Sequence, residues 1–400
     1  MTRTARDHHI LVLGGGYTGM TAALRAAGRT RRHGGRVTLV NPSTRFVERL
    51  RMHQIATGQR LADHQIPDLL EGSGVAFVQG RATGIDLDGQ TVTVDTPDGP
   101  RALAYDTLVY ALGSFTDTST VPGAAEVAHT LNGPDAARAL ATRLAELPAG
   151  ATVAVCGGGL TGVEAATEIA ESHPDLRVTL LSRGVPGPRM NPKAHRYLMN
   201  ALARLGVEVR TGVEITKVLS DGVEVDGGEP VPADLTVWTT GFRAAPLAAR
   251  AGLAVDDAGR IVVDPTLRSV SHPSVYAVGD SAAIPQKYGV MHGTCQGGIP
   301  SAAGAADAIA RRLRGKEAKP FRFGYIHQPV SLGRRDAVIQ FTYPDDSPRR
   351  WKLTGRRAVI YKDLVSSSPV PSFKLMRRMP RILVWTHGGR ATKGAVATTA

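Results

Sequence analysis

Short apolar runs that end in glycine-rich turns are the dominant pattern along this chain. Residues 10–13 form an uninterrupted apolar run, three glycines follow, and small residues then fill positions 20–27. A second apolar run occupies residues 37–40. Continuous apolar runs of this length are typical of parallel strands that are covered on both faces. The pattern therefore predicts a strand, a tight turn, a helix and a second strand at the start of the chain.

The same pattern returns in the middle of the chain. Residues 153–156 and 178–181 are again apolar runs that flank a glycine turn and a helical stretch. The similarity extends further, because residues 233–241 parallel residues 105–113, each as a buried strand that stops at a glycine. This internal duplication predicts two Rossmann-like βαβ units.

The remaining patterns predict elements of several kinds. Helices are expected at 133–147, 192–205 and 299–313, and an apolar strand that ends in Gly-Asp is expected at 274–280. The β-type runs at 75–78 and 91–95 predict a small β-meander over the first sheet. From residue 321 the pattern indicates short strands and basic turns, with a linker at 366–371 and disorder at 391–400.

Both glycine turns carry the spacing Gly-x-Gly-x-x-Gly. The glycines are Gly14, Gly16 and Gly19 in the first copy and Gly157, Gly159 and Gly162 in the second. In this spacing the first glycine makes the turn, the second lets a pyrophosphate approach the backbone, and the third lets the helix pack on the strand. The N-terminus of the helix then holds the phosphates. Two such cradles predict two bound dinucleotides that exchange a hydride.

Composition and charge narrow the expectation. A length of 400 residues fits two to three domains, and two cysteines, Cys156 and Cys295, argue against a disulfide framework and for a reducing cytoplasm. Neither a secretory signal nor a membrane-spanning segment is expected from the apolar pattern of the sequence. Residues 309–400 hold 20 basic and 5 acidic residues, within a net charge of +13 for the chain. This excess indicates an anionic partner, such as a lipid surface, or else a solvated arginine-rich surface.

Five motifs occur in order along the chain, namely Gly14-x-Gly16-x-x-Gly19, Tyr110-Ala-x-Gly113, Gly157-x-Gly159-x-x-Gly162-x-Glu164, Trp238-x-x-Gly241 and Ala277-x-Gly279-Asp280. With these motifs the chain resembles the flavoproteins with two dinucleotide-binding domains, in the pyridine nucleotide-disulfide oxidoreductase superfamily. The resemblance covers about residues 10–340 and is strongest to type II NADH dehydrogenases and apoptosis-inducing-factor-like NAD(P)H:quinone oxidoreductases. It implies an α/β fold with two Rossmann-like domains and a small α+β C-terminal domain.

The resemblance also implies domain boundaries. An FAD-binding domain is expected at 1–116 and 251–320, with an inserted NAD(P)H-binding domain at 117–250. A C-terminal domain for interface or membrane association is expected at 321–390, before the tail at 391–400.

Contacts to FAD follow by resemblance from the first cradle and its neighbours. The implied residues are Gly14, Gly15, Gly16, Tyr17, Thr18, Gly19, Asn41, Arg51, Ala82, Gly113, Gly279 and Asp280. Asp280 matches the aspartate that accepts hydrogen bonds from the ribityl chain. Asn41 stands where the family places a carboxylate on the adenosine ribose, and its amide can still hydrogen-bond a hydroxyl but carries no charge.

The second cradle is implied to bind NAD(P)H. The residues are Gly157, Gly159, Gly162, Glu164, Ser182, Arg183 and Gly241, with Glu164 near the nicotinamide. A carboxylate after the second strand would favour NADH, but this chain offers Ser182 and Arg183. A hydroxyl and a guanidinium suit a 2′-phosphate, so we expect NADPH to be used at least as well as NADH.

The cysteine positions bear on the electron acceptor. Residues 41–58 contain no cysteine, so no thiol relay of the disulfide-reductase type is encoded there. Cys295 and Gln296 fall where quinone dehydrogenases present residues to the flavin, and together with Glu164 they are the catalytic candidates. Cys295 has a second interpretation, as a residue that only packs behind the flavin. No metal ligands are expected.

The expected function is an FAD-dependent NAD(P)H:acceptor oxidoreductase that reduces a quinone-like acceptor without a redox disulfide. One alternative is a tailoring flavoenzyme of secondary metabolism. Another is a slow redox-sensing flavoprotein that binds an anionic partner through its basic tail, although the tail lacks the interleaved aromatic and basic residues of nucleic-acid modules.

The C-terminal tail has its own expectation. Residues 373–385 mix cations with Phe, Leu, Met and Trp, which favours adsorption to a membrane or packing on the body or on a second subunit of a homodimer. Pro380 is expected to end any helix there. The location would then be cytoplasmic, with peripheral attachment to the inner face of the membrane if the tail adsorbs.

Overall fold

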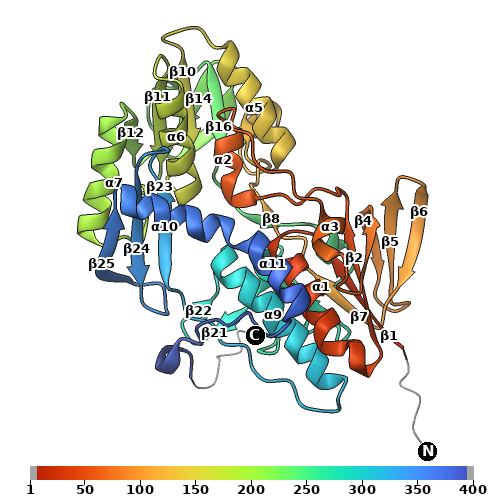
Figure 1. The fold of residues 1–400 in the computed structure, drawn as a ribbon. Coiled ribbons are helices and arrows are strands. Elements are labelled where there is room, and N and C mark those ends of the chain that lie inside the picture. Colours follow the sequence, from red (N-terminus) through yellow and green to blue (C-terminus); the bar gives the residue numbers. More distant parts are fainter. Residues whose placement is uncertain (1–6, 394–400) are drawn as a thin grey trace, which may run out of the picture.

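The computed structural model describes residues 7–393, and two five-stranded parallel sheets dominate it (Figure 1). The first sheet has the order β19-β7-β1-β2-β3. Its strands are β1 (His8–Leu13), β2 (Gly35–Asn41), β3 (Val75–Gln79), β7 (Thr107–Tyr110) and β19 (Val275–Ala277). All four pairings are parallel. The chain therefore leaves this sheet after β7 and returns to its edge more than a hundred residues later.

The second sheet repeats this topology, with the order β12-β11-β10-β16-β9. Its strands are β9 (His129–Thr130), β10 (Thr152–Cys156), β11 (Arg177–Ser182), β12 (Glu208–Thr211) and β16 (Leu235–Trp238). In each sheet the strand before a glycine turn lies in the centre, between the strand that follows the turn and the strand that ends near Gly113 or Gly241. The predicted α/β fold with an internal duplication is confirmed.

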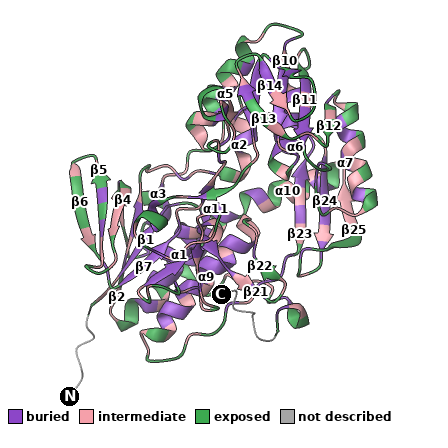
Figure 2. Ribbon diagram, turned by 180° about the vertical axis from the view of Figure 1, so that it is seen from behind, coloured by how far each residue is buried: buried purple, intermediate pink, exposed green. Residues whose placement is uncertain are grey.

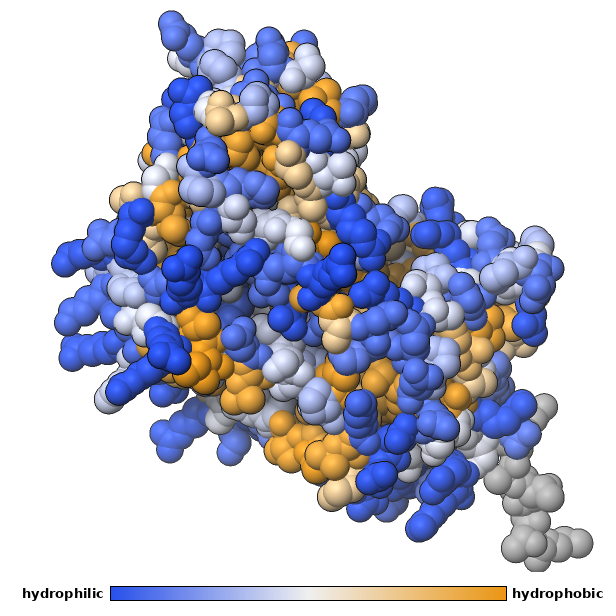
Figure 3. All heavy atoms as spheres, turned by 45° about the horizontal axis from the view of Figure 1, so that its top comes forward, coloured by the Kyte–Doolittle hydropathy of each residue, from blue (hydrophilic) through white to orange (hydrophobic). Residues whose placement is uncertain are grey.

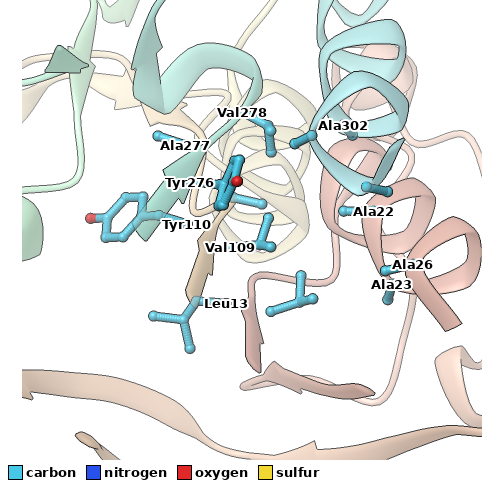
Figure 4. Close-up of a cluster of buried hydrophobic side chains, with 14 of the residues drawn as sticks. Leu13, Ala22, Ala23, Ala26, Val109, Tyr110, Tyr276, Ala277, Val278 and Ala302 are labelled. Carbon is cyan, nitrogen blue, oxygen red and sulfur yellow. The ribbon is translucent and has the colours of Figure 1, made fainter. Parts of the chain in front are cut away.

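Small side chains let two helices pack closely on the first sheet. Figure 4 shows Ala22, Ala23 and Ala26 of α1 (Tyr17–Thr30) and Ala302 of α9 (Cys295–Arg312) near the apolar strand residues. All of these alanines are buried. The distance between helix axes depends on the side chains at the contact, so alanine allows a close approach. This packing places the N-termini of both helices at the carboxyl ends of the strands.

Three helices of 13 residues each pack beside the second sheet. They are α5 (Pro134–Glu146), α6 (Leu160–Ser172) and α7 (Pro192–Arg204). The core beside the second sheet draws its apolar residues from these helices and from β10, β11 and β16. Buried residues accordingly gather in the sheets and on the helix faces that cover them (Figure 2).

The chain passes from the first sheet to the second and later returns, and these two connecting segments run antiparallel to each other. β8 (Ser114–Phe115) pairs with β17 (Arg243–Ala244). Beside this pair, Asp117 accepts a hydrogen bond from Arg243 Nε at 2.7 Å, and its carbonyl accepts one from Trp238 Nε1 at 2.9 Å. The outgoing and returning segments are thus tied at one point. The boundaries near residues 116, 250 and 320 stay predictions.

The meander predicted from 75–78 and 91–95 is wrong in its first member. β3 joins the parallel sheet as its edge strand. A separate antiparallel sheet is formed by β4 (Arg81–Asp86), β5 (Thr91–Thr96) and β6 (Gly99–Ala104). The run Val-Ala-Phe-Val of β3 does not alternate between apolar and polar residues, as a half-exposed antiparallel strand would. A continuous apolar run is typical of a strand in a parallel sheet.

Short elements connect these units. The helices are α2 (Met52–Ile55), α3 (Ile66–Leu70), α4 (Ala124–Val127) and α8 (Leu247–Arg250). The strands are β13 (Ile215–Leu219), β14 (Gly222–Val225), β15 (Val231–Pro232), β18 (Ile261–Val262), β20 (Ala282–Ala283), β21 (Pro285–Gln286) and β22 (Gly289–Val290).

The C-terminal part holds three antiparallel strands and two helices. They are β23 (His327–Ser331), β24 (Ala337–Thr342), β25 (Pro348–Thr354), α10 (Arg356–Ser367) and α11 (Pro369–Arg378). The linker predicted at 366–371 is wrong, because it is the junction of these two helices. Pro369 occupies the first turn of α11, where its missing N–H is not needed.

The tail differs in part from its prediction. α11 ends two residues before Pro380, as expected, and Phe373 and Met376 are buried in the hydrophobic core around the first sheet. A short 3₁₀ turn at Gly389–Thr392 buries Thr392, so disorder at 391 and 392 is wrong, and residues 394–400 lie outside the described residues. Within residues 7–393, no helix combines the length and the apolar character needed to cross a membrane.

Candidate functional site

The first glycine turn is shaped by close backbone approach. Gly14 has φ +100°, and a Cβ on it would lie 2.5 Å from the carbonyl oxygen of Ala111. A Cβ on Gly19 would collide with the carbonyl oxygen of Gly14, so the helix can pack on the strand only with glycine there. Gly16 faces open space and begins α1 without a side-chain cap. The exposed N–H groups of this helix start fit a pyrophosphate.

The second turn has the same construction. Gly157 has φ +122° and lies against Thr239, and a Cβ on Gly162 would collide with the carbonyl oxygen of Gly157. Gly159 faces open space and begins α6, again without a side-chain cap. Each of the two sheets therefore carries one turn whose geometry fits a dinucleotide.

Several predicted residues gather around the first turn. Asn41, at the end of β2, accepts a hydrogen bond from the Gly15 amide at 2.8 Å. Thr18 lies against Gly279, where a Cβ would be 2.6 Å from the Thr18 methyl carbon. Asp280 follows β19 and accepts a hydrogen bond from Ser114 Oγ at 2.9 Å. The carboxyl ends of β1, β2 and β19 thus meet at this turn.

Three other residues predicted to contact FAD make contacts of other kinds. The ring of Tyr17 packs edge-on against Phe46, at a centroid distance of 5.2 Å. Arg51 donates from Nε to Gln54 at 2.8 Å, in the segment before α2. Ala82 lies in β4, in the separate antiparallel sheet. Their contacts with a flavin stay predictions.

Glu164 makes a buried polar cluster that the sequence did not reveal. Its side chain in α6 accepts hydrogen bonds from Lys362 Nζ and from the Ser331 amide, the latter at 3.0 Å. His53 Nδ1 lies 3.9 Å from its second oxygen. Burial alone would raise the pKa of Glu164, but Lys362 and His53 outweigh it and hold that pKa below its usual value. Lys362 comes from α10, in a region where only strands and turns were expected.

Cys295 and Gln296 begin α9, with different surroundings. Burial, and then the charge of Asp280, raise the pKa of the Cys295 thiol to about 11, so the thiol is protonated at neutral pH. Gln296 accepts from the Ile326 amide at 2.6 Å and donates to the His327 carbonyl at 2.8 Å. Gln296 therefore fastens α9 to the start of β23.

The charge of Lys362 acts on groups near the start of α9 as well as on Glu164. It lowers the pKa values of both Cys295 and His327, in each case after the effect of burial. Burial and then the charge of Lys362 lower the pKa of His327 to about 4. Lys362 therefore lies within electrostatic range of the N-terminus of α9 as well as being bonded to Glu164.

Ser182 and Arg183 lie where the second strand of the second unit ends. Ser182 is buried against Gly158, where a Cβ would be 2.7 Å from the Ser182 Cβ. The Arg183 side chain is 77% exposed and lies 3.3 Å from Glu214. Its guanidinium is thus available to a ligand beside the second turn. Among residues 7–393, no cluster of three metal-ligating side chains occurs.

Comparison with known proteins identifies relatives over most of this chain. A NADH dehydrogenase-like protein of Mycobacterium tuberculosis is 32% identical over 351 residues, which cover 82% of this chain and 86% of that protein. Demethylphylloquinone reductase NdbB of Synechocystis is 28% identical over 382 residues, which cover 91% and 93%.

Solved structures share the fold at low sequence identity. The sulfide:quinone oxidoreductase of Aquifex aeolicus has a TM-score of 0.79 at 20% identity, covering 92% of both chains. NDH2 of Plasmodium falciparum in complex with NADH has a TM-score of 0.77 at 15% identity, covering 94% of this chain and 98% of NDH2. The family model described as pyridine nucleotide-disulphide oxidoreductase matches residues 8–308. This chain therefore belongs to the pyridine nucleotide-disulphide oxidoreductase family.

Proposed function

We propose that this protein is an FAD-dependent NAD(P)H:acceptor oxidoreductase that reduces a quinone-like acceptor. The observation that carries the proposal is the pair of matched glycine turns, in which Gly16 and Gly159 both face open space at a helix start. The names of the relatives, NADH dehydrogenase-like protein and demethylphylloquinone reductase, support this assignment.

A bound flavin would supply the redox chemistry, taking a hydride from the nicotinamide and passing its two electrons on to the quinone-like acceptor. The residues of this chain would hold the reactants in place and exclude thiol chemistry. Asp280 and the turn at Gly14–Gly19 would hold FAD, and the turn at Gly157–Gly162 would hold the nicotinamide nucleotide. Cys156 is buried in β10 of the second sheet and Cys295 begins α9 beside the first, and both are free cysteines, so they do not form a redox disulfide.

Reduction of a quinone consumes two protons as well as two electrons, and Lys362 is suited to hold one of them. Its ammonium group has three N–H donors. Glu164 and the Pro329 carbonyl, the latter at 3.2 Å, accept two of these donors. In this proposal the third donor faces the acceptor, while Glu164 and the Pro329 carbonyl hold the ammonium group in place.

The proposal includes use of NADPH at least as well as NADH. Ser182 ends β11 and Arg183 follows it, at the position where the family reads the 2′ substituent of the ribose. A guanidinium forms bidentate, charge-assisted hydrogen bonds with phosphate. Its weak pairing with Glu214, at 3.3 Å on an exposed surface, would yield readily to such a ligand.

Peripheral attachment to an anionic membrane is also part of the proposal. α10 and α11 expose Ile360, Leu364 and Leu375, and Figure 3 shows hydrophobic patches among hydrophilic side chains on one face of the molecule. Apolar side chains combined with the basic excess of residues 309–400 favour adsorption to anionic lipid. Sedimentation with liposomes tests this, and loss of binding in Ile360→Ser/Leu364→Ser is expected.

Anaerobic stopped-flow measurements test the reaction itself. The purified protein with bound flavin is mixed with NADPH or NADH and then with a short-chain quinone. Rapid loss of flavin absorbance followed by its recovery with quinone is the expected result. A flavin that is reduced but not reoxidised by quinones would instead favour a tailoring enzyme, and a protein that binds no FAD would contradict the proposal.

A further inference from the structure

A cationic cavity lies at the opposite end of α1 from the first glycine turn. It has a volume of about 560 Å³ and is lined by Arg29, Arg31, Arg32, His33, Arg314 and Arg381, among others. α1 has 14 residues, so the cavity is about 20 Å from the glycine turn. No carboxylate within residues 7–393 lines it. The cavity is therefore separate from the site described above.

The cavity forms because the C-terminal segment is held on α1. Arg25 is buried and donates to the carbonyls of Pro380 at 3.0 Å and Leu383 at 3.3 Å. Gly28 leaves room for the ring of Pro380, which would collide with a Cβ there. These contacts bring Arg381 beside the ends of α1 and α9, to complete the ring of arginines.

The ordinary reason for arginines at these positions is compensation of the helix dipoles. The adjacent C-termini of α1 and α9 carry about half a negative charge each. Asp307 adds one charge, and both Arg25 and Arg29 share it, at 2.8 and 3.1 Å. The helix ends and Asp307 together supply about two negative charges. Six arginines face them, namely the five that line the cavity and Arg25. Helix dipoles thus explain only part of the positive charge.

Two buried donors in this cluster lack acceptors. Arg29 Nε and Arg314 Nε are buried and make no hydrogen bond within residues 7–393, although Arg314 Nη2 donates to the Arg29 carbonyl at 3.0 Å. Arg29 Nε is close to Asp307, but its N–H is not aligned for a hydrogen bond. Burial, with additional repulsion from Arg381, Arg25 and Arg314, lowers the pKa of Arg29 against the attraction of Asp307. Buried donors without acceptors are costly, so an anion would stabilise this arrangement.

We propose that this cavity binds a ligand that bears one or more phosphate groups. Guanidinium groups match phosphate geometry bidentately, and several of them converge here. The volume lies within the range of about 300–1,000 Å³ that is usual for small-molecule sites. Met379, Pro380 and Ile382 line one side and offer apolar contact to an organic part of the ligand. The phosphate would come from a free phosphorylated metabolite or from the headgroup of an anionic lipid.

Calorimetric titration with inorganic pyrophosphate tests the site directly. The full chain is used with its flavin bound and with saturating NAD⁺, so that both glycine turns are occupied. Arg32→Gln/Arg381→Gln removes two exposed lining charges and is expected to weaken binding about tenfold or more. Arg101→Gln/Arg350→Gln removes the same charge from exposed positions outside the cavity and is the matched control.

A second arm separates the two sources of phosphate. Co-sedimentation is measured with vesicles of phosphatidylglycerol and phosphatidylcholine and with vesicles of phosphatidylcholine alone. Pyrophosphate binding that only the cavity variant weakens supports the site with a free ligand. Selective loss of phosphatidylglycerol binding in that variant supports the site with a lipid headgroup. Absence of both kinds of binding, or equal weakening in the control variant, would overturn the proposal. None of these outcomes depends on the redox reaction.

Discussion

Asn41 Oδ1 accepts a hydrogen bond from the Gly15 amide at 2.8 Å, and Asn41 Nδ2 donates to the Ser43 carbonyl at 2.7 Å. The side chain that was predicted to contact a ribose is therefore also a brace for the first glycine turn. A neutral amide can accept from Gly15 without placing a negative charge beside the pyrophosphate, which a carboxylate in the same position would do.

Asn41→Ala is expected to weaken FAD binding about tenfold, because it removes a hydrogen bond that fixes the turn. Asn41→Asp keeps the acceptor for Gly15 and is expected to bind FAD more tightly than Asn41→Ala. Fluorescence titration of the flavin-free protein with FAD measures both. Asn132→Ala is the control, since Asn132 accepts a comparable bond from the Thr116 amide outside the turn. Equal affinity in Asn41→Ala and the native protein would show that the brace is dispensable.

Loss of Lys362 is expected to destabilise the protein by about 3–5 kcal/mol, because Lys362→Met leaves the buried carboxylate of Glu164 without its partner. Urea unfolding at pH 7 measures the change in the free energy of unfolding. Glu164→Gln/Lys362→Met removes both charges and is expected to recover most of the loss. Lys374→Met, at an exposed position of α11, is the control.

The same pair makes a pH prediction. The pKa of Glu164 is held below its ordinary value of 4.5 in the folded protein, so its stabilising contribution is present above about pH 4.5. That contribution falls as the pH drops through the lowered pKa. Stability curves from pH 7 to pH 3 should therefore differ most between the native protein and Glu164→Gln at neutral pH. A difference that grows toward acid would contradict this assignment.

How much of this site could be predicted from sequence depends on how local the determinants are. The spacing of Gly14, Gly16 and Gly19 encodes a turn within six residues, so the two units could be placed in advance. The partners of Glu164 could not, because α6 and α10 are brought together by their packing on β23. No short pattern links His53, Glu164 and Lys362, which are spread over three hundred residues. Likewise, the arginine cavity depends on the contact of Pro380 with Gly28 and on the hydrogen bonds from Arg25, which join segments far apart in the sequence.

The nucleotide preference tests the role of Arg183. Arg183→Ala is expected to raise the KM for NADPH about tenfold and to change that for NADH less than about twofold, since only NADPH carries the 2′-phosphate. Arg210→Ala is a suitable control, because Arg210 forms a similar exposed pair with Glu208 at 2.7 Å. A strong preference for NADH that Arg183→Ala leaves unchanged would remove Arg183 from nucleotide selection.

Cys295 decides whether a thiol takes part in electron transfer. Its pKa of about 11 leaves less than about one thiol in a thousand ionised at pH 7.5, so alkylation by iodoacetamide should be slow and should accelerate with rising pH. Cys156 is buried, and its pKa is raised to about 12, so it should not contribute to the signal. Cys295→Ser is expected to retain quinone turnover within about twofold, because it exchanges one sulfur atom for oxygen at the start of α9 and a protonated thiol has no part in the proposed reaction. Intact-mass analysis after alkylation and steady-state quinone reduction provide the two measurements. Rapid alkylation at neutral pH, together with loss of turnover in Cys295→Ser, would instead show that the thiol takes part in the reaction.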